Sequence, residues 1–290
     1  MKKNRNSVYL IFGILLFSNI LAWLWVYDLN NPAFLRVIFF DVGQGESILL
    51  VSPKGHQVLI DGGPDSRILE KLAKEIPFWD NSLDLIVLTH PSSDHLNGLI
   101  AVLERYQIKN ILWTGIIVDS SVYEEWQKAI KKEGAEIFIA QANQRVRMGK
   151  KTYLDILNPL KNIEGQEIKN SKEINNSSIV ARLVHLQNSF LFTADIEKPV
   201  EQKLLERKAL LNSDILKIAH HGSRTSSSEE FLKSVLPKMA VISVGKNNRH
   251  GHPHQETLET LVKYDITILR TDRDGDIKII SDGNNYRIIR

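Results

Sequence analysis

The chain has 290 residues, enough for one large or two small domains with a buried core, and it contains no cysteine. The missing thiols exclude disulfides, thiolate metal sites and a cysteine nucleophile, and leave His, Asp and Glu as candidate metal ligands. The formal net charge is +3. Lys2, Lys3 and Arg5 account for three basic residues and Asp28 for one acidic residue. The remainder is therefore nearly neutral, unlike most nucleic-acid-binding domains.

The first 28 residues contain an uncharged apolar stretch at 8–27, "VYLIFGILLFSNILAWLWVY". About 20 such residues span a bilayer as a helix, and basic residues in front of it favour a cytoplasmic N-terminus. A cleaved signal peptide or a buried helix are the alternatives, but no small-x-small cleavage site follows. We predict a cytoplasmic basic segment at 1–7, a single-pass anchor at 8–27 in a bacterial cytoplasmic membrane, and a linker at 28–33.

Strand and helix patterns alternate over residues 34–290. The first half predicts strands at 34–43, 47–52, 57–61, 83–90, 108–114 and 136–140, and helices at 65–75, 96–106 and 121–134. The second half predicts strands at 152–157, 178–186, 189–194, 213–223, 239–245, 266–271, 276–281 and 286–290, helices after Pro199 and at 228–236 and 256–264, and a surface loop at 161–177. The two halves thus contain comparable sets of strands and helices, which predicts one α/β domain with two sheets packed face to face and helices outside.

Side chains that can bind metals follow apolar strands at four places in this domain. These are His90, Asp94 and His95, then Asp195, then His220 and His221, and finally His250, His252 and His254. They include seven of the nine histidines. Loops at strand ends are where α/β folds assemble sites, and imidazole and carboxylate groups suit zinc, manganese or iron. The pattern predicts a metal centre. The competing interpretation is ordinary loop polarity, with Asp94 and Asp195 as helix caps.

The motifs resemble those of the metallo-β-lactamase fold superfamily, whose signature is H-x-H-x-D-H after a strand. The best match within it is the extracellular C-terminal domain of ComEC-type competence (DNA-uptake) proteins. The matching segments, in order over about residues 34 to 283, are "FFDVGQGESILL", "VLIDGG", "LTHPSSDHLNG", "NNSSIVARL…FLFTAD", "ILKIAHHGSRTSSS" and "GHPHQETL". The resemblance implies a four-layer αββα sandwich at 34–290, preceded by the transmembrane helix, and metal-dependent hydrolysis.

The resemblance also implies a ligand set. His90 would bind one metal, Asp94 and His95 would bind a second, Asp195 would bridge the two, and His221 would complete the second site. Gly222 permits close approach and favours His221 over its neighbour His220 as the ligand. A water held between two cations would attack phosphorus, since the cations make it acidic and stabilise charge on the phosphate oxygens.

Further roles follow for residues around these ligands. Asp94 would orient the attacking water, and His252 would contact a substrate phosphate, donate the leaving-group proton or bind metal. His220, Ser223 and His254 are expected to bind substrate, although Ser223 could equally belong to a helix cap. Elsewhere, Asp61 is expected to support the site, His250 to lie outside it, His56 and His185 to lie in a turn and on a strand surface, and Trp113 and Trp126 to pack in the core.

Ser92 departs from the family pattern, because many superfamily members have His there and ComEC-type domains often have Asp. Asn175 and Asn176 stand where the family supplies another histidine. The first site then keeps only His90 and Asp195 as good ligands. We therefore expect one firmly bound divalent ion, zinc or manganese, and a second bound weakly.

Three functions remain open at this stage. The leading one is a membrane-anchored, outward-facing phosphodiesterase or nuclease, with the cell membrane, DNA and a DNA-uptake apparatus as partners. The near-neutral domain weakens the assignment to DNA, and a single apolar span cannot form the pore. The second is a hydrolase of a cell-envelope phosphodiester or small ester. The third is a non-catalytic domain that binds nucleic acid or a partner, because Ser92 replaces a ligand.

Overall fold

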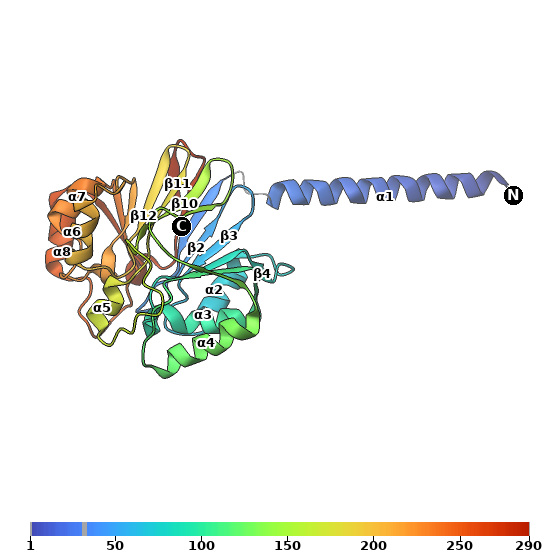
Figure 1. Cartoon of the computed structure of the whole chain (residues 1–290). Coiled ribbons are helices and arrows are strands. Elements are labelled where there is room, and N and C mark those ends of the chain that lie inside the picture. The colour runs from blue at the N-terminus through green and yellow to red at the C-terminus, as the bar shows by residue number, and fades with distance from the viewer. Residues whose placement is uncertain (1, 31–33, 290) are drawn as a thin grey trace.

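The computed structural model describes residues 2–30 and 34–289 (Figure 1). Residues 31–33 of the predicted linker, Met1 of the basic segment and Arg290 of the last strand lie outside the described residues. The N-terminal helix α1 runs over Lys2–Asn30 and stands apart from the domain. Its stretch Asn6–Val26 is exposed along its length, and by length and composition it could cross a membrane. The helix extends three residues past the predicted apolar stretch.

Two large sheets carry most of the strands. The eight-stranded sheet has the order β17-β16-β1-β2-β3-β5-β7-β8 and the seven-stranded sheet the order β15-β14-β13-β12-β11-β10-β9. The first contains β1 (Leu35–Phe39), β2 (Ile48–Val51), β3 (Gln57–Ile60), β5 (Leu85–Leu88), β7 (Asn110–Trp113), β8 (Glu136–Ile139), β16 (Ile277–Ser281) and β17 (Tyr286–Ile289). The second contains β9 (Arg145–Arg147), β10 (Thr152–Asn158), β11 (Val180–His185), β12 (Asn188–Phe192), β13 (Ile215–Lys217), β14 (Met239–Ile242) and β15 (Thr267–Arg270). A separate pair joins β4 (Ser82–Leu83) to β6 (Gln107–Ile108).

Helices cover the outer face of each sheet (Figure 1). The eight-stranded sheet packs against α2 (Arg67–Glu75), α3 (Ser93–Arg105) and α4 (Ser121–Glu133), and the seven-stranded sheet against α6 (Lys198–Glu206), α7 (Glu229–Val235) and α8 (Gln255–Lys263). Short helical segments are α5 (Ser171–Asn176), α9 (Thr271–Asp274) and the 3-10 turn η1 (Ala219–Gly222). The αββα sandwich confirms the predicted fold.

Side-chain alternation along the strands builds three apolar layers. In β1, Leu35, Val37 and Phe39 enter the core between the sheets, whereas Ile38 faces the helices. Successive strand residues point to opposite faces, so a strand covered on both sides must be apolar throughout. This is why the segments read as continuous apolar runs in the sequence.

One predicted loop contains a helix. Residues 161–177 were expected to be irregular, but α5 forms at 171–176, where the Asn170 side chain accepts a hydrogen bond from the Glu173 amide at 2.8 Å. Asparagine at this position satisfies an otherwise unpaired helix N–H group, so a polar six-residue helix forms without an apolar stripe. The helix matters because it carries Asn175 to the site described below.

The parallel strands of each sheet end at the edge of the domain where the predicted ligands lie. β1 and β3 are each antiparallel to β2, and β3, β5 and β7 are parallel, so all four run in one direction. In the other sheet β12, β13 and β14 are parallel. The loops that leave the carboxyl ends of these strands carry the predicted ligands, which is the usual location of a site in an α/β fold.

Candidate metal centre

The segment from the end of β5 into α3 carries three of the predicted ligands, His90, Asp94 and His95. Ser92 occupies the N-cap position of α3, and Asp94 and His95 lie in its first turn. His95 Nδ1 lies 2.7 Å from Asp61 Oδ2. A carboxylate can only accept, so Nδ1 carries the proton and Nε2 is left to face the other ligands.

Thr89 holds the Asp61 carboxylate in position through two hydrogen bonds. Its Oδ1 accepts from the Thr89 amide at 2.8 Å and its Oδ2 from the Thr89 hydroxyl at 2.7 Å. The chain after it must pass close to α3: a Cβ added at Gly62 would lie 2.2 Å from the Leu99 amide nitrogen. Asp61 therefore supports His95 in the way the sequence predicted, and the following glycine permits the approach.

The turn η1 provides His221 through an unusual backbone. His220, His221 and Gly222 have φ of 51°, 54° and 83°, all in the left-handed region. A Cβ at Gly222 would lie 2.5 Å from Pro253 Cβ, so only glycine fits there. His221 Nδ1 donates to the Ser243 carbonyl at 2.8 Å, which again leaves Nε2 free to act as a ligand.

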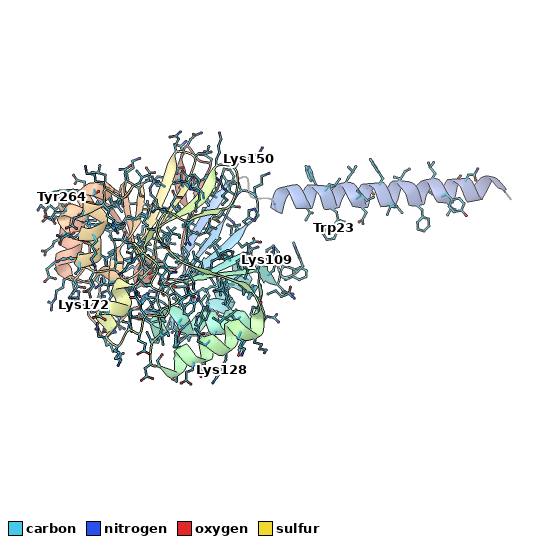
Figure 2. All side chains as sticks on the ribbon, in the orientation of Figure 1. Trp23, Lys109, Lys128, Lys150, Lys172 and Tyr264 are labelled. Carbon is cyan, nitrogen blue, oxygen red and sulfur yellow. The ribbon has the colours of Figure 1, made fainter. Side chains whose placement is uncertain are left out.

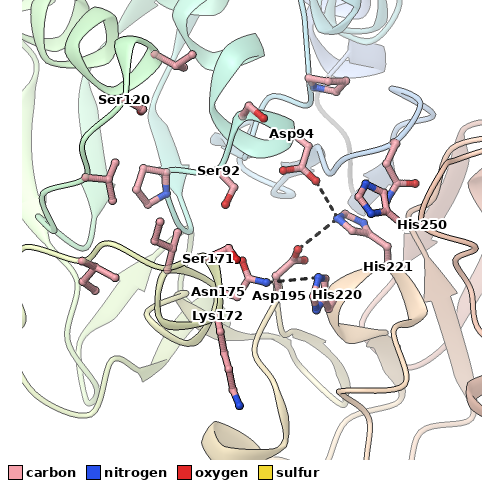
Figure 3. Close-up of a pocket in the computed structure, with 18 of the residues that line it drawn as sticks. Ser92, Asp94, Ser120, Ser171, Lys172, Asn175, Asp195, His220, His221 and His250 are labelled. Carbon is pink, nitrogen blue, oxygen red and sulfur yellow. Dashed lines mark hydrogen bonds and ion pairs between the residues drawn. The ribbon is translucent and has the colours of Figure 1, made fainter.

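The side chains of Asp94, His95, Asp195 and His221 converge where these loops meet. Figure 3 shows Asp94, Asp195 and His221 pointing toward one another. Asp195 Oδ2 lies 3.4 Å from His95 Nε2 and 3.3 Å from His221 Nε2, and Asp94 Oδ2 lies 3.3 Å from His221 Nε2. One ligand atom from each of Asp94, His95, Asp195 and His221 lies within 4.8 Å of the other three.

The donor set fits a divalent cation. The Nε2 atoms of His95 and His221 are buried and find no hydrogen-bond partner among the described residues. Buried polar atoms rarely remain unpaired unless a ligand or ion completes them. Two imidazoles and two carboxylates are a ligand set suited to zinc or manganese.

The charges of the four groups balance. Burial lowers the pKa of His221, but the Asp195 carboxylate outweighs it and raises the pKa to about 9. The pKa of His95 likewise rises well above its ordinary value, because Asp195, Asp61 and Asp94 together outweigh burial. Burial raises the pKa of Asp195, but His221 and His95 hold it well below its usual range. Two protonated imidazoles thus offset the two carboxylates, and a divalent ion would supply the same charge.

A buried lysine lies directly behind the bridging carboxylate. Lys217 is 0% exposed, and its ammonium group pairs with Glu46, donates to the Ala194 carbonyl at 2.9 Å and lies 3.6 Å from Asp195 Oδ1. Burial lowers the pKa of Lys217, but the Glu46 and Asp195 carboxylates raise it above its ordinary value. Asp195 therefore directs one oxygen to Lys217 and the other to His95 and His221.

Glu46 and Lys217 belong to the site although no motif in the sequence marked them. The available signal was a single charge inside the apolar run "ILKIA" at residues 215–219, where an unpaired ammonium would be costly to bury. Glu46, Asp61 and His95 form a second cluster of potential metal ligands. Because Glu46 already pairs with the Lys217 ammonium, we interpret this cluster as a charge network and not as another metal site.

The first predicted metal position is less complete. His90 is fully buried with its ring 4.2 Å from that of His95, yet it is not one of the four clustered ligands. Burial, reinforced by His95, lowers its pKa to about 3. Ser92 and Asn175 line the cavity, whereas Asn176 accepts the Glu197 amide at 2.9 Å. Asn175 is thus the asparagine placed to contribute an oxygen.

Asp94, Asp195 and His221 line a cavity of about 1150 Å³. Lys169, Lys172 and Arg249 line it, together with His220 and His252. Figure 3 shows Lys172 and Asn175 on one side and His220, His221 and His250 on the other. Asp119 and Glu197 line the cavity too, and Lys172 Nζ lies 4.0 Å from Glu197 Oε2. The lining therefore carries both charges, with Lys169 and Arg249 as further cations for an anionic substrate.

His252 has one buried nitrogen, Nδ1, without a hydrogen-bond partner in the part of the chain that the structure describes. Burial, together with the neighbouring His221, lowers the pKa of His252 to about 4. The imidazole is neutral near pH 7, so it is suited to hydrogen bonding or accepting a proton and not to donating one as an imidazolium. Of the three predicted roles, a neutral His252 is most compatible with contact to a substrate phosphate or with metal binding.

Several predicted residues lie elsewhere than expected. Ser223 is buried with its hydroxyl 3.0 Å from Thr225 Oγ1, and His254 Nδ1 accepts the Arg224 amide at 3.2 Å; neither lines the cavity. Both form hydrogen bonds within the local turn, and their predicted role in substrate binding stays a prediction. His250 was expected outside the site but lines the cavity.

The other residues predicted to lie outside the site have structural roles. His185 was predicted on a strand surface, but it is buried, with Nδ1 2.8 Å from Thr152 Oγ1. His56 lies 3.7 Å from Asp84 in a turn region. Trp113 and Trp126 are buried with rings 6.2 Å apart, as expected for core packing.

Comparison with known proteins agrees with this architecture. Residues 40–246 match the family described as the metallo-beta-lactamase superfamily. Similar curated proteins include ComE operon protein 3 of Bacillus subtilis, 33% identical over 262 residues (84% of this chain, 32% of that protein), and competence protein ComA of Neisseria gonorrhoeae, 30% identical over 244 residues (83% and 32%). Recombination protein 2 of Haemophilus influenzae is 27% identical over 276 residues (94% and 31%). The chain thus spans about a third of the length of these relatives.

Solved structures share the fold at low identity. The metallo-β-lactamase-fold protein YhfI of Bacillus subtilis superposes with a TM-score of 0.53 at 14% identity, covering 81% of this chain and 96% of that one. The metallo hydrolase Igni18 of Ignicoccus hospitalis gives 0.54 at 12% identity, covering 84% and 98%. With its αββα layers, strand-end ligands and similarity to competence proteins, the chain belongs to the metallo-β-lactamase superfamily.

Proposed function

We propose that the chain is a membrane-anchored, outward-facing, metal-dependent phosphodiesterase that acts on DNA. The observation that carries the proposal is the four-ligand group of Asp94, His95, Asp195 and His221 at the floor of a cavity with cationic side chains. Similarity to proteins named for competence favours DNA over other phosphodiesters. α1 supports the anchoring, and the basic residues before its apolar stretch favour an N-terminus inside and a domain outside.

The four ligands would hold one ion firmly, and His90, Ser92 and Asn175 would form a weaker neighbouring position. When bound, the ion would act as a Lewis acid towards a phosphoryl oxygen and lower the pKa of water. The partly exposed Asp94 carboxylate would accept a hydrogen bond from the attacking water. Lys169, Lys172 and Arg249 would bind the flanking phosphates, and neutral His252 would form a hydrogen bond with the substrate.

The test pairs metal analysis with hydrolysis by the full chain in detergent. The substrates are single-stranded DNA, duplex DNA and bis-(4-nitrophenyl) phosphate, a generic phosphodiester. Asp195→Ala should lose bound metal and all three activities. Asp155→Ala, which removes a carboxylate paired with Arg145 away from the cavity, should retain both.

The outcomes separate the proposal from its competitors. Turnover of the generic diester without DNA cleavage would favour the cell-envelope phosphodiester or small-ester hydrolase. Less than one metal equivalent and no turnover would favour the non-catalytic binding domain suggested by Ser92. Unchanged hydrolysis by Asp195→Ala would refute the metal-dependent mechanism.

A further inference from the structure

The loop that leads from α2 into β4 presents two neighbouring aromatic side chains to solvent. Phe78 is 89% exposed and Trp79 is 57% exposed, with their rings edge to face at 4.8 Å. Among the described residues 34–289, no other large hydrophobic side chain exposes a greater fraction than Phe78. Large exposed aromatics that are adjacent in sequence form an apolar projection that usually has a partner.

This loop is held beside the point where the N-terminal segment enters the domain. Glu75, the last residue of α2, pairs with Arg36 at 3.4 Å and with Lys278 at 2.7 Å. Arg36 is the second residue of β1. Asp80, directly after Trp79, accepts from the Gln57 side chain at 2.8 Å.

The sheet register fixes the same placement independently. Arg36 pairs with Val51, and Val51 pairs with Gln57, so Arg36 and Gln57 lie in one row of the sheet, two strands apart. Adjacent strands are about 4.8 Å apart, so this row spans roughly 10 Å. The residues on either side of the aromatic pair, Glu75 and Asp80, are therefore bound to residues at the starting ends of β1 and β3.

The chain that joins this end of the domain to the apolar helix is short. The apolar stretch ends at Val26 and β1 begins at Leu35. Eight intervening residues reach at most about 28 Å when fully extended. The amino-terminal end of β1 must then stay near any bilayer that α1 crosses. Figure 1 shows the loop beside β4 projecting on the side from which α1 leaves, and Figure 2 places Lys109 on this side and Tyr264 on the opposite one.

We propose that Phe78 and Trp79 insert into the lipid interface beside α1 and form a second contact between the domain and the membrane. Aromatic rings favour the interfacial region of a bilayer, where their apolar faces leave water. This inference rests on the proposed anchoring by α1. It goes further by assigning a membrane-facing end to the domain.

The contact also orients the metal centre. β1, β3 and β5 begin at the aromatic end and run in parallel towards the end that carries Asp61 and His90. A domain that rests on Phe78 and Trp79 therefore directs its cavity away from the bilayer. Substrate would enter from the aqueous side and not from the lipid.

The absence of cysteine in the sequence allows a direct test with single introduced thiols. Phe78→Cys and Val262→Cys are labelled with an environment-sensitive nitrobenzoxadiazole dye in the full chain, reconstituted into phosphatidylethanolamine–phosphatidylglycerol vesicles. Val262 is the matched control, because it is 66% exposed and lies on α8, next to Tyr264 on the opposite side. Carbonate extraction of the vesicles first establishes whether the chain is anchored.

The label at Phe78 should shift to shorter wavelength and be quenched at least twofold by nitroxide-bearing lipids, whereas the label at Val262 should remain in water. An anchored chain whose two labels both report water would overturn the inference and leave the anchoring intact. A blue-shifted Phe78 label that lipid nitroxides do not quench would identify a protein partner in place of lipid and also overturn it. Release of the chain by carbonate would overturn both proposals.

Discussion

Lys217→Met should destabilise the domain more than the substitution of an exposed lysine, because it removes a fully buried cation that contacts two buried carboxylates. The lysine is 0% exposed and holds Glu46 and Asp195 together. Methionine has a similar length and fills the space without the charge. Breaking a buried ion pair by removing one partner costs about 3–5 kcal/mol. At about 2–4 °C per kcal/mol for a domain of this size, the melting temperature should fall by roughly 6–20 °C.

The assay is thermal unfolding of the full chain in detergent, followed by circular dichroism with chelator present so that bound metal does not contribute. Lys238→Met is the matched control: its ammonium pairs with Asp214 at 2.9 Å but is 73% exposed, so the cost should be at most about 1 kcal/mol. Adding Glu46→Gln to Lys217→Met should recover part of the loss, because the second change removes the unpaired carboxylate. Equal stability of Lys217→Met and Lys238→Met, or no recovery in the double variant, would refute the reasoning.

Three further predictions concern the metal centre. Asp61→Asn should weaken metal affinity about 10–100-fold in a chelator competition, because His95 loses the carboxylate that fixes its tautomer; unchanged affinity would contradict this role. Ser92→Asp should raise metal content towards two equivalents by elemental analysis, and a content that stays at one would show that this position is not the missing ligand. In metal-free protein, the raised pKa of His221, about 9 against 6.5, gives a stabilisation that is complete below pH 6.5 and lost as pH rises to about 9, up to about 3 kcal/mol. Melting temperatures in chelator should fall over this window but stay level with zinc bound, and a flat metal-free profile would refute the shift.

The sequence was most informative where burial dictates residue type. β2 and β5 are apolar throughout and β1 is apolar apart from Arg36, because both faces are covered, and the polar residues that follow mark the strand ends. Helix α4 was recognisable from its apolar spacing and from Gly134, which ends it with φ of 71°. The six-residue α5 has no such apolar stripe, so its pattern was indistinguishable from that of a loop.

The site was predictable in its composition but less so in its geometry. The spacing of Asp94 and His95 after a strand indicated a metal loop, yet nothing in the pattern could show that Ser223 and His254 turn into local hydrogen bonds. Those orientations depend on the left-handed turn at 220–222 and its contact with Pro253. Similarly, the role of Lys217 could not be predicted, because its partner Glu46 lies 171 positions earlier in the chain and is brought beside it only by the packing of the two sheets.

The four metal ligands come in equal shares from the two halves of the sandwich: Asp94 and His95 from the eight-stranded side, Asp195 and His221 from the seven-stranded side. A fragment that contained one half would keep only two ligands and would not retain an ion. If the proposed site binds metal, uptake during folding would follow the docking of the halves, and the bound ion would hold the two halves together. Retention of an ion would report that the two halves of the domain have assembled completely.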